Sequence, residues 1–553
     1  MNVVDTEVID TARAWLAQDP DPATRAELEP VISDAAAGSL AAIADLHARF
    51  DTRLAFGTAG LRGELGAGSN RMNRVLVAQA AAGLAAYLTS HEDEPSVVIG
   101  YDGRENSDVF AIDTAEIMAG AGVRAILLPR RLPTPVLAFA VRHLKVSAGV
   151  MVTASHNPPR DNGYKVYLGG RHEGSQIVPP SDADIAAFID EVAASSVLAL
   201  PRSPEYETAD ETVVDAYIAA TSALVPQAAA PVAFVYTAMH GVGWETARRV
   251  FEASGFDGAI VVPEQIEPDA AFPTVAFPNP EEPGAMDLAL ELAASRGAEL
   301  VIANDPDADR LAVAVPEGSG WRRLSGNEVG LLLGWRAAER LRVPNGTFAA
   351  SIVSSPGLAA IARKHAIDYV DTLTGFKWIS RAGGLVYGFE EALGYLVNPG
   401  TVRDKDGISA ALDFLGLYAD LKAAGTTLAE HQRAFDERFG AFASRQISLR
   451  VTELAEISRY MSELRLTPPA AIGGLKVDRI EDFSSGFGKF GPSDILRIWV
   501  EGEGRVIVRP SGTEPKLKVY IDASSTIGSV EEKRAAATQT VEALEAGMRE
   551  LLV

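Results

Sequence analysis

A serine hydroxyl that could act as a reacting group lies on a predicted turn at the end of an apolar run. Residues 146–153 are predicted to form a β-strand, and the sequence Thr-Ala-Ser-His-Asn-Pro overlaps its end, so that Ser155 lies on a turn. Reacting groups of open α/β sheets lie at such strand ends. We expect His156 to point away from Ser155 and to form no nucleophile–base pair with it. A GxSxG hydrolase motif is absent, and a simple turn is the alternative interpretation.

Three carboxylates alternate along a second loop. Asp305, Asp307 and Asp309 lie in Asn-Asp-Pro-Asp-Ala-Asp-Arg, between the apolar runs 300–303 and 311–315. Oxygen ligands suit a hard cation such as Mg²⁺, and burying three carboxylates without a cation is costly. A calcium EF-hand needs glycine at the sixth loop position and glutamate at the twelfth, where this chain has arginine and proline. The loop therefore predicts a magnesium site, with a solvated acidic turn as the alternative.

A third and a fourth candidate site carry the side chains that bind polyols and phosphates. Glu390 lies in Gly-Phe-Glu-Glu-Ala-Leu-Gly-Tyr at a predicted strand end, and Lys377 precedes it in Thr-Gly-Phe-Lys. Carboxylates accept hydrogen bonds from sugar hydroxyls, although an exposed acidic loop is the alternative here. A loop between two later predicted strands combines an arginine, two hydroxyls, a glycine that exposes backbone N–H groups, and a lysine. We expect these residues to form an oxyanion-binding site: Arg509, Ser511, Gly512, Thr513 and Lys516.

The loop 56–63 is rich in glycine and holds Arg62. It matches neither the dinucleotide-binding GxGxxG pattern nor the phosphate-binding GxxxxGK[ST] pattern. The loop by itself indicates no particular ligand.

Apolar runs and helical stretches alternate along most of the chain. Strands are predicted at 96–101, 125–128, 146–153, 233–237, 259–262, 299–303, 347–353 and 385–388, and a helix at 213–224 after a proline-rich linker. Later strands are predicted at 446–451, 475–480, 495–500, 506–509 and 517–521, before a helix at 530–552. The predicted class is α/β, with α/β domains of mixed sheets over 1–205, 206–318 and 319–440. A C-terminal α+β domain follows over 441–553.

Composition narrows the classes of function. The 553 residues carry a formal net charge of −24, which disfavours binding to nucleic acid. There is no cysteine, which excludes disulfides, thiolate metal sites and cysteine nucleophiles. The acidic first residues do not match a signal peptide, and no apolar stretch is long enough to span a bilayer. We therefore expect a cytoplasmic protein that binds a small molecule and neither nucleic acid nor membrane.

Taken together and in this order, the motifs resemble the α-D-phosphohexomutase superfamily of phosphoglucomutases and phosphomannomutases. The resemblance runs from about Leu54 to Tyr520 and implies that the four domains lie around one central cleft. The sequences of residues 56–63, 236–243 and 388–395 look closest to the branch with phosphoglucomutase-2-like enzymes, some of which prefer phosphopentoses. Ala392 stands where many glucose and mannose mutases have serine, which puts a strict hexose preference in doubt.

The resemblance implies a role for each candidate residue. Ser155 is similar to the serine that is phosphorylated in the active enzyme, and Asp305, Asp307 and Asp309 to the carboxylates that hold Mg²⁺ with a phosphoserine oxygen. The resemblance also implies that four catalytic residues surround that phosphate: Arg62, His156, Lys165 and Arg310. Of these, Lys165 is the candidate for proton transfer. The sugar would be bound by Lys377 and Glu390, and its non-reacting phosphate by Arg509, Ser511, Gly512 and Thr513.

The implied activity interconverts glucose 1-phosphate and glucose 6-phosphate through a phosphoserine and glucose 1,6-bisphosphate, which also serves as activator. Phosphomannomutase or phosphopentomutase activity is the nearest alternative. A non-catalytic sugar-phosphate-binding protein and a Mg²⁺-dependent phosphatase are further alternatives.

Overall fold

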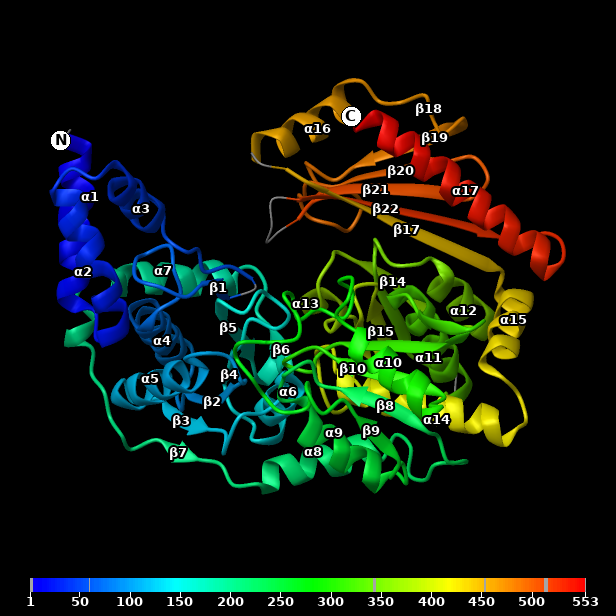
Figure 1. Cartoon of the computed structure of the whole chain (residues 1–553), viewed down its shortest axis with the longest axis horizontal. Helices are drawn as coiled ribbons and strands as arrows, with labels where there is room; N and C mark the ends of the chain where they lie inside the picture. The colour runs from blue at the N-terminus through cyan, green and yellow to red at the C-terminus, as the bar shows by residue number, and fades with distance from the viewer. Residues whose placement is uncertain (1–2, 59, 342–344, 452–453, 512–515, 553) are drawn as a thin grey trace. The chain divides into compact units, whose positions relative to one another are not determined.

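The computed structural model describes residues 3–58, 60–341, 345–451, 454–511 and 516–552. The chain folds into two compact units (Figure 1). The first contains the residues up to Leu324 together with Gly394–Gly416, and the second contains Ser325–Leu393 and the residues from Leu417 onward. The described strands form four sheets.

Three helices open the first unit: α1 (Val3–Gln18), α2 (Pro22–Ala36) and α3 (Leu40–Phe50). The side chain of Asp21 accepts a hydrogen bond from the N–H of Ala23, and Pro22 begins α2, a favourable position for proline. Trp15, Leu28 and Leu46 are buried in the same core as the first sheet. These helices therefore belong to the first α/β layer.

The first sheet has the order β1-β5-β4-β2-β3-β7, with β6 paired to β5. Its strands β4, β2, β3 and β7 are parallel, and β5 is antiparallel to β4. The strands are β1 (Leu61–Glu64), β2 (Ser96–Tyr101), β3 (Arg124–Leu127), β4 (Ala148–Val152), β5 (Asp161–Leu168), β6 (Ser175–Gln176) and β7 (Glu207–Thr208). The helices are α4 (Arg74–His91), α5 (Ser107–Gly120), α6 (Thr134–His143) and α7 (Ser181–Ala193). The predicted strands 96–101, 125–128 and 146–153 correspond to β2, β3 and β4.

The second sheet of this unit has the order β12-β11-β10-β8-β9. Strands β8, β9 and β10 are parallel, and β10 and β11 form an antiparallel pair. The elements are α8 (Thr212–Ser222), β8 (Phe234–Thr237), α9 (Gly243–Ala253), β9 (Ala259–Val261), α10 (Asp287–Arg296), β10 (Leu300–Asn304), β11 (Leu311–Glu317) and β12 (Gly320–Arg323). The first unit also contains β16 (Gly394–Leu396) and the start of α14 (Gly407–Ala423).

The second unit begins with a parallel sheet in which β13 (Thr347–Ser351) lies between β14 (Asp368–Thr372) and β15 (Leu385–Glu390). Its helices are α11 (Gly326–Arg340), α12 (Gly357–His365), the short α13 (Phe376–Ile379) and α15 (Leu428–Phe439). The Ser325 and Glu328 side chains form a capping box that fixes the start of α11.

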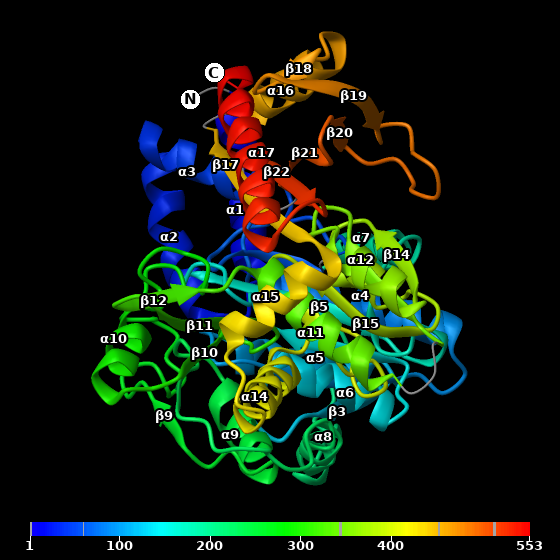
Figure 2. The ribbon, with the colours of Figure 1, turned by 90° about the vertical axis from the view of Figure 1, so that its right-hand side faces the viewer.

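The C-terminal part of this unit is the predicted antiparallel sheet, in the order β17-β22-β21-β20-β19-β18. Its strands are β17 (Ala441–Arg450), β18 (Ala471–Ile472), β19 (Leu475–Asp482), β20 (Leu496–Val500), β21 (Gly504–Pro510) and β22 (Lys516–Ser525). Helix α17 (Val530–Leu551) packs on β17 and β22 (Figure 2), and α16 (Leu454–Leu466) joins the same core. Val506 and Val508 face this core while Ile507 faces the opposite side, as strand periodicity requires.

Within the described residues, no helix combines the length and the apolar character that crossing a membrane requires.

Candidate functional site

The turn that carries Ser155 joins β4 to β5. The serine is 2% exposed, and its φ of +51° is in the left-handed region that non-glycine residues rarely adopt. Its N–H donates to Oγ1 of Thr153 at 2.8 Å, which ties the serine to the end of β4. Its hydroxyl donates to Oδ2 of Asp305 at 2.7 Å. The two chemically distinctive loops of the sequence therefore meet at this hydroxyl.

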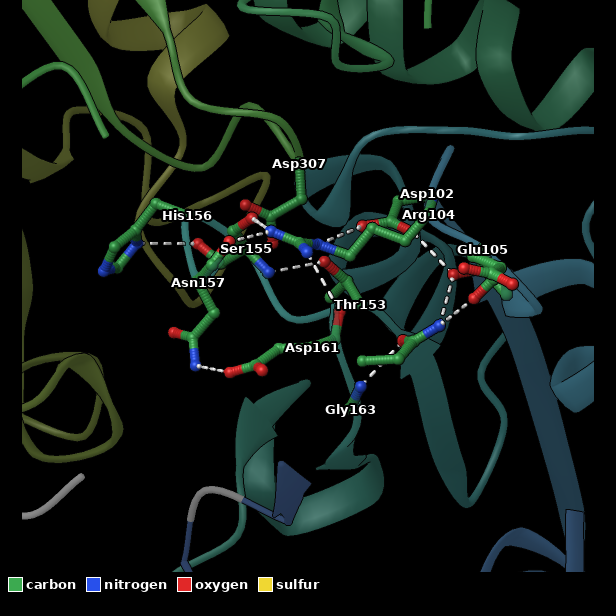
Figure 3. Close-up of polar contacts among 12 residues, drawn as sticks. Asp102, Arg104, Glu105, Thr153, Ser155, His156, Asn157, Asp161, Gly163 and Asp307 are labelled. Carbon is green, nitrogen blue, oxygen red and sulfur yellow. Dashed lines mark hydrogen bonds and ion pairs between the residues drawn. The ribbon is translucent and has the colours of Figure 1, made fainter. Parts of the chain in front are cut away.

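The expectation that His156 points away from Ser155 is wrong. Nδ1 of His156 lies 3.2 Å from Oγ of Ser155 (Figure 3). The left-handed conformation of Ser155 bends the chain, so the two consecutive side chains turn toward each other. Burial, followed by the nearby Arg310 and Arg62, holds the pKa of His156 well below its usual range. The imidazole is therefore neutral at neutral pH.

The three aspartates occupy the tight connection between β10 and β11. All three are 0% exposed, and their ligand oxygens lie within 4.8 Å of one another. The side chain of Asn304 donates to the carbonyl of Arg310 at 2.6 Å and closes the loop. Gly241 allows the loop to pack closely, because a Cβ there would lie 2.2 Å from the carbonyl oxygen of Pro306. The loop is thus held in one conformation from both sides.

This donor set fits a hard divalent cation. Oδ1 of Asp307 and Oδ1 of Asp309 are buried and have no hydrogen-bond partner among the described residues. Burial, together with the charges of Asp307 and Asp309, raises the pKa of Asp305 well above its usual value. A cation bound to the three carboxylates would remove both penalties. The prediction that these aspartates could hold a metal therefore agrees with their geometry.

Two buried lysines balance the aspartates. Nζ of Lys165, on β5, lies 2.7 Å from Oδ2 of Asp307 and 3.2 Å from Oδ2 of Asp309. Nζ of Lys405 lies 2.8 Å from Oδ2 of Asp309. Burial alone would raise the pKa of Asp307, but Lys165, Thr134 and Lys405 outweigh it and lower that pKa. Asp307 is therefore held as a carboxylate.

Two predicted arginines join this group. Nη1 of Arg62, on β1, donates to Oδ1 of Asn157 at 3.1 Å. The backbone N–H of Arg310 donates to Oδ1 of Asp305 at 3.0 Å, and its Nε lies 3.9 Å from Oδ1 of Asp309. The first unit thus brings together every candidate that the sequence placed around the serine and the aspartates.

The predicted sugar-binding residues lie in the second unit. Oε1 of Glu390, at the end of β15, accepts a hydrogen bond from the N–H of Gly375 at 2.9 Å. Gly375 immediately precedes α13, the helix that contains Lys377. The neighbouring Glu391 accepts at Oε2 from the hydroxyl of Ser354 at 2.8 Å. Burial and the charge of Glu390 raise the pKa of Glu391 to about 7.

The predicted phosphate cradle begins at the end of β21. Nε of Arg509 donates to the carbonyl of Pro510 at 3.2 Å, and the N–H of Ser511 donates to the carbonyl of Lys516 at 2.8 Å. Gly512 and Thr513 lie outside the described residues. Arg509 and Ser511 are both half-buried.

Four family models match consecutive stretches of the chain. They are the phosphoglucomutase/phosphomannomutase α/β/α domains I (residues 53–195), II (215–318) and III (325–437), and the C-terminal domain (449–537). The chain belongs to the phosphoglucomutase/phosphomannomutase family. It is an isomerase of the phosphohexomutase type with the four-domain α/β architecture of that family, which confirms the predicted superfamily and fold class. The individual domain boundaries stay predictions.

Relatives of this mutase carry several substrate names. A probable phosphomannomutase of Haemophilus influenzae is 57% identical and covers 82% of this chain and 93% of its own. A phosphoribomutase of Saccharomyces cerevisiae is 35% identical over 97% of this chain and 95% of its own, and a Staphylococcus epidermidis relative with 35% identity is named phosphoglucomutase. The crystal structure of a putative phosphomannomutase from Thermus thermophilus matches with a TM-score of 0.68 at 25% identity, covering 90% of this chain and all of that one.

Two buried cations of the mutase were missed in the sequence. Lys405 lies in Arg-Asp-Lys-Asp-Gly, where alternating charges after an apolar strand were a usable signal. Arg104 follows β2 in Tyr-Asp-Gly-Arg, which is again a charged segment at a strand end. The contact of Lys405 with Asp309 and that of Arg104 with the carbonyl of Ser155 join segments distant in sequence, so local patterns did not indicate these contacts.

Proposed function

We propose that this mutase interconverts glucose 1-phosphate and glucose 6-phosphate by way of phosphorylated Ser155 and glucose 1,6-bisphosphate. The observation that carries the proposal is the 2.7 Å contact between Oγ of Ser155 and Oδ2 of Asp305, inside a buried group of three carboxylates. A hydroxyl fixed at the edge of a cation site is suited to exchanging a phosphoryl group.

In the proposed cycle, the sugar monophosphate's free hydroxyl oxygen forms a bond to phosphorus as the bond from phosphorus to Oγ of Ser155 breaks. The hydroxyl loses its proton to a nearby base, and Ser155 ends as a hydroxyl after taking up a proton. The bisphosphate then reverses these steps with its other phosphate. Atoms and charge balance, and the net reaction moves one phosphoryl group on the sugar.

The buried side chains have distinct tasks in this proposal. Asp305, Asp307 and Asp309 would hold Mg²⁺, which supplies neutralisation of the charge on the transferring phosphoryl group. Lys165, which lies 2.7 Å from Oδ2 of Asp307, is the candidate for moving the hydroxyl proton. Lys405 is a second candidate, since it occupies an equivalent position on Asp309.

Arg62, His156 and Arg310 complete the proposed surroundings of the transferring phosphoryl group. Arg62 and Arg310 supply positive charge toward it, while the neutral His156 can share one hydrogen bond with Oγ of Ser155.

The loops of the second unit are proposed to bind the rest of the substrate. Lys377 and Glu390 would contact sugar hydroxyls. Arg509, Ser511, Gly512 and Thr513 would hold the phosphate that is not reacting. Because either phosphate must occupy this cradle in turn, it cannot depend on one orientation of the sugar.

A pentose phosphate is the second candidate substrate, and mannose phosphate is the third. Ala392 replaces a serine that many hexose mutases use, which favours a sugar with fewer hydroxyl contacts. Relatives named phosphoribomutase and phosphopentomutase support the pentose, and the relative named probable phosphomannomutase supports mannose.

The test is turnover of glucose 1-phosphate, mannose 1-phosphate and ribose 1-phosphate in parallel, with Mg²⁺ and a trace of the matching bisphosphate. We expect glucose 1-phosphate to give the highest kcat/KM. Ser155→Ala should lose transfer by roughly 10³-fold or more while still binding sugar phosphate, whereas Ser147→Ala, which changes a hydroxyl outside the site, should match the wild type. Free phosphate equal to substrate loss would identify a phosphatase instead.

A further inference from the structure

A buried guanidinium lies under the serine turn. Arg104 is 4% exposed and directly follows β2. Its Nη2 donates to the carbonyl oxygens of Ser155 and Asn157, both at 2.6 Å (Figure 3). Its Nη1 donates to the carbonyl oxygens of Pro158 at 2.8 Å and Asp161 at 2.9 Å. One side chain therefore binds four carbonyls of a single turn.

This contact pattern uses the whole end of the guanidinium. The two terminal nitrogens of arginine together have four N–H groups, and here each nitrogen donates to two carbonyl oxygens. Four carbonyls that converge on one planar group fix the curvature of the turn. A lysine has three donors on one atom and could not reproduce the fork.

The turn needs such a restraint. The positive φ of Ser155 is strained for a residue with a side chain and persists only where the surroundings enforce it. The backbone N–H of Ser155 donates to the hydroxyl of Thr153, and its backbone carbonyl accepts from the guanidinium of Arg104. Together they fix both peptide groups of the residue whose hydroxyl contacts Asp305.

Arg104 is itself fixed from two directions. Oδ1 of Asp102 accepts from the backbone N–H of Arg104 at 2.9 Å and from the hydroxyl of Ser107 at 2.7 Å, and Oδ2 of Asp102 lies 3.8 Å from Nε. The ring of Phe272, between β9 and α10, lies 5.0 Å from the guanidinium carbon. The cation is thus buried between one carboxylate and one aromatic ring.

We propose that Arg104 is a positioning residue that holds Ser155 in its left-handed conformation and aims Oγ at the transferring phosphoryl group. The proposal rests on the proposed role of Ser155 as phosphoryl carrier. Burying a guanidinium on neutral carbonyls is costly, and the gain is a turn that stays fixed whether or not the serine carries phosphate. Arg104 acts through the backbone, so its loss changes the rate of transfer and leaves sugar binding intact.

A loosened turn has a second consequence. Phosphorylated Ser155 can pass its phosphoryl group to a sugar hydroxyl or to water, and only the first requires the aimed geometry. In the second case a water oxygen bonds to phosphorus, the bond to Oγ breaks, and inorganic phosphate leaves. The ratio of hydrolysis to transfer should therefore rise when Arg104 is replaced.

The experiment compares Arg104→Lys and Arg104→Met with Arg74→Lys. Arg74 is the control because its guanidinium also makes a forked contact, binding the carboxylate of Asp113 at 2.7 and 2.8 Å, but lies outside the serine turn. We expect kcat to fall about 10²-fold in both Arg104 variants, with KM changed by less than about 3-fold and hydrolysis of labelled phosphoenzyme increased relative to transfer. Arg74→Lys should keep kcat and the hydrolysis ratio.

Unchanged kcat in folded Arg104 variants, or a change confined to KM, would overturn the proposal. If both variants fail to fold, Phe272→Leu and Asp102→Asn decide, because each loosens the guanidinium without removing it. A lower kcat with a raised hydrolysis ratio in them supports the proposal, and wild-type values overturn it. Labelling of wild-type Ser155 by the bisphosphate is measured first, since its absence would reject the phosphoserine mechanism itself.

Discussion

Each of the two units holds a group of neighbouring carboxylates, fully buried aspartates in the first and the half-buried Glu390 and Glu391 in the second, and the two groups are balanced in different ways. Asp307 and Asp309 contact two lysines, and the pKa of Asp307 is held below its usual value. Glu391 contacts the hydroxyl of Ser354, and burial with the charge of Glu390 raises its pKa to about 7. Lys518 lowers that pKa, but by less than these two effects raise it.

The difference indicates what each group is suited to bind. Carboxylates that are balanced by ammonium groups, as Asp307 and Asp309 are by Lys165 and Lys405, can exchange those groups for a divalent cation. A pair of glutamates in which the charge of one raises the pKa of the other is suited to neutral hydroxyls, because hydroxyls can both donate and accept hydrogen bonds. The first group would thus handle charge, and the second would recognise a polyol.

The largest expected effect comes from removing one charge of each group. Asp307→Asn should lower transfer roughly 10²- to 10³-fold and abolish the rise in Tm that Mg²⁺ gives the wild type. Glu391→Gln should keep that rise and alter mainly KM. Activity and thermal unfolding with and without Mg²⁺ measure both. Two results would contradict the assignment of cation binding to the aspartates and polyol binding to the glutamates. One is a Tm of Asp307→Asn that still rises with Mg²⁺, and the other is a Tm of Glu391→Gln that no longer does.

A smaller effect is expected from removing one counter-charge. Lys405→Met should lower kcat about 10- to 10²-fold. It should also shift the Mg²⁺ concentration for half-maximal activity downward, because the ammonium group no longer competes for Oδ2 of Asp309. The exposed Lys364→Met is the control for loss of a positive charge. A Mg²⁺ requirement that rises in Lys405→Met would argue against competition.

Part of the fold could be predicted because several of the central strands are apolar along most of their length. The runs at 96–101 and 233–237 coincide with buried strands of parallel sheets, which have no polar face to confuse the pattern. Strand β5 was not predicted, since Asn162, Gly163 and Lys165 break its apolar pattern. Lys165 is polar because it contacts the aspartates of the site, and Asn162 is polar because it donates to the carbonyl of Glu105 and the hydroxyl of Ser107. The prediction therefore failed where specific polar contacts replace apolar packing.

The site was predictable where it is local in sequence. Three aspartates in one short loop indicated their own proximity, and the geometry agrees. The orientation of His156 was not predictable, because it depends on the φ angle of Ser155, which Arg104 helps to fix from outside the motif and Thr153 from within it. Lys405 reaches Asp309 only through the tertiary fold. Contacts that join distant segments leave little trace in a single sequence.

The raised pKa of Glu391 predicts a pH dependence of stability. The folded state binds this proton more tightly than the unfolded chain, so the free energy of unfolding should fall as pH rises from 4.5 to 7 and then level off. The loss should be at most ~3 kcal/mol. Asp406, whose pKa burial raises to about 6, acts in the same direction at lower pH.

Glu391→Gln separates these two groups. Measured by urea unfolding in excess Mg²⁺, the variant should lose the decline between pH 6 and 7 and keep the part due to Asp406 below pH 6. A decline between pH 6 and 7 as steep as in the wild type would show that Glu391 is not the titrating group.

The smallest effects should come from two hydroxyls, one supporting each unit's loop. Thr153→Val removes the acceptor for the N–H of Ser155, and Ser354→Ala removes the hydroxyl that both donates to Glu391 and accepts from its N–H. We expect Thr153→Val to lower kcat about 10-fold with little change in KM, and Ser354→Ala to raise KM about 3-fold with little change in kcat. Steady-state kinetics separates the two parameters. If both variants change the same parameter, the two loops do not divide transfer and recognition between them, because each hydroxyl supports only its own loop.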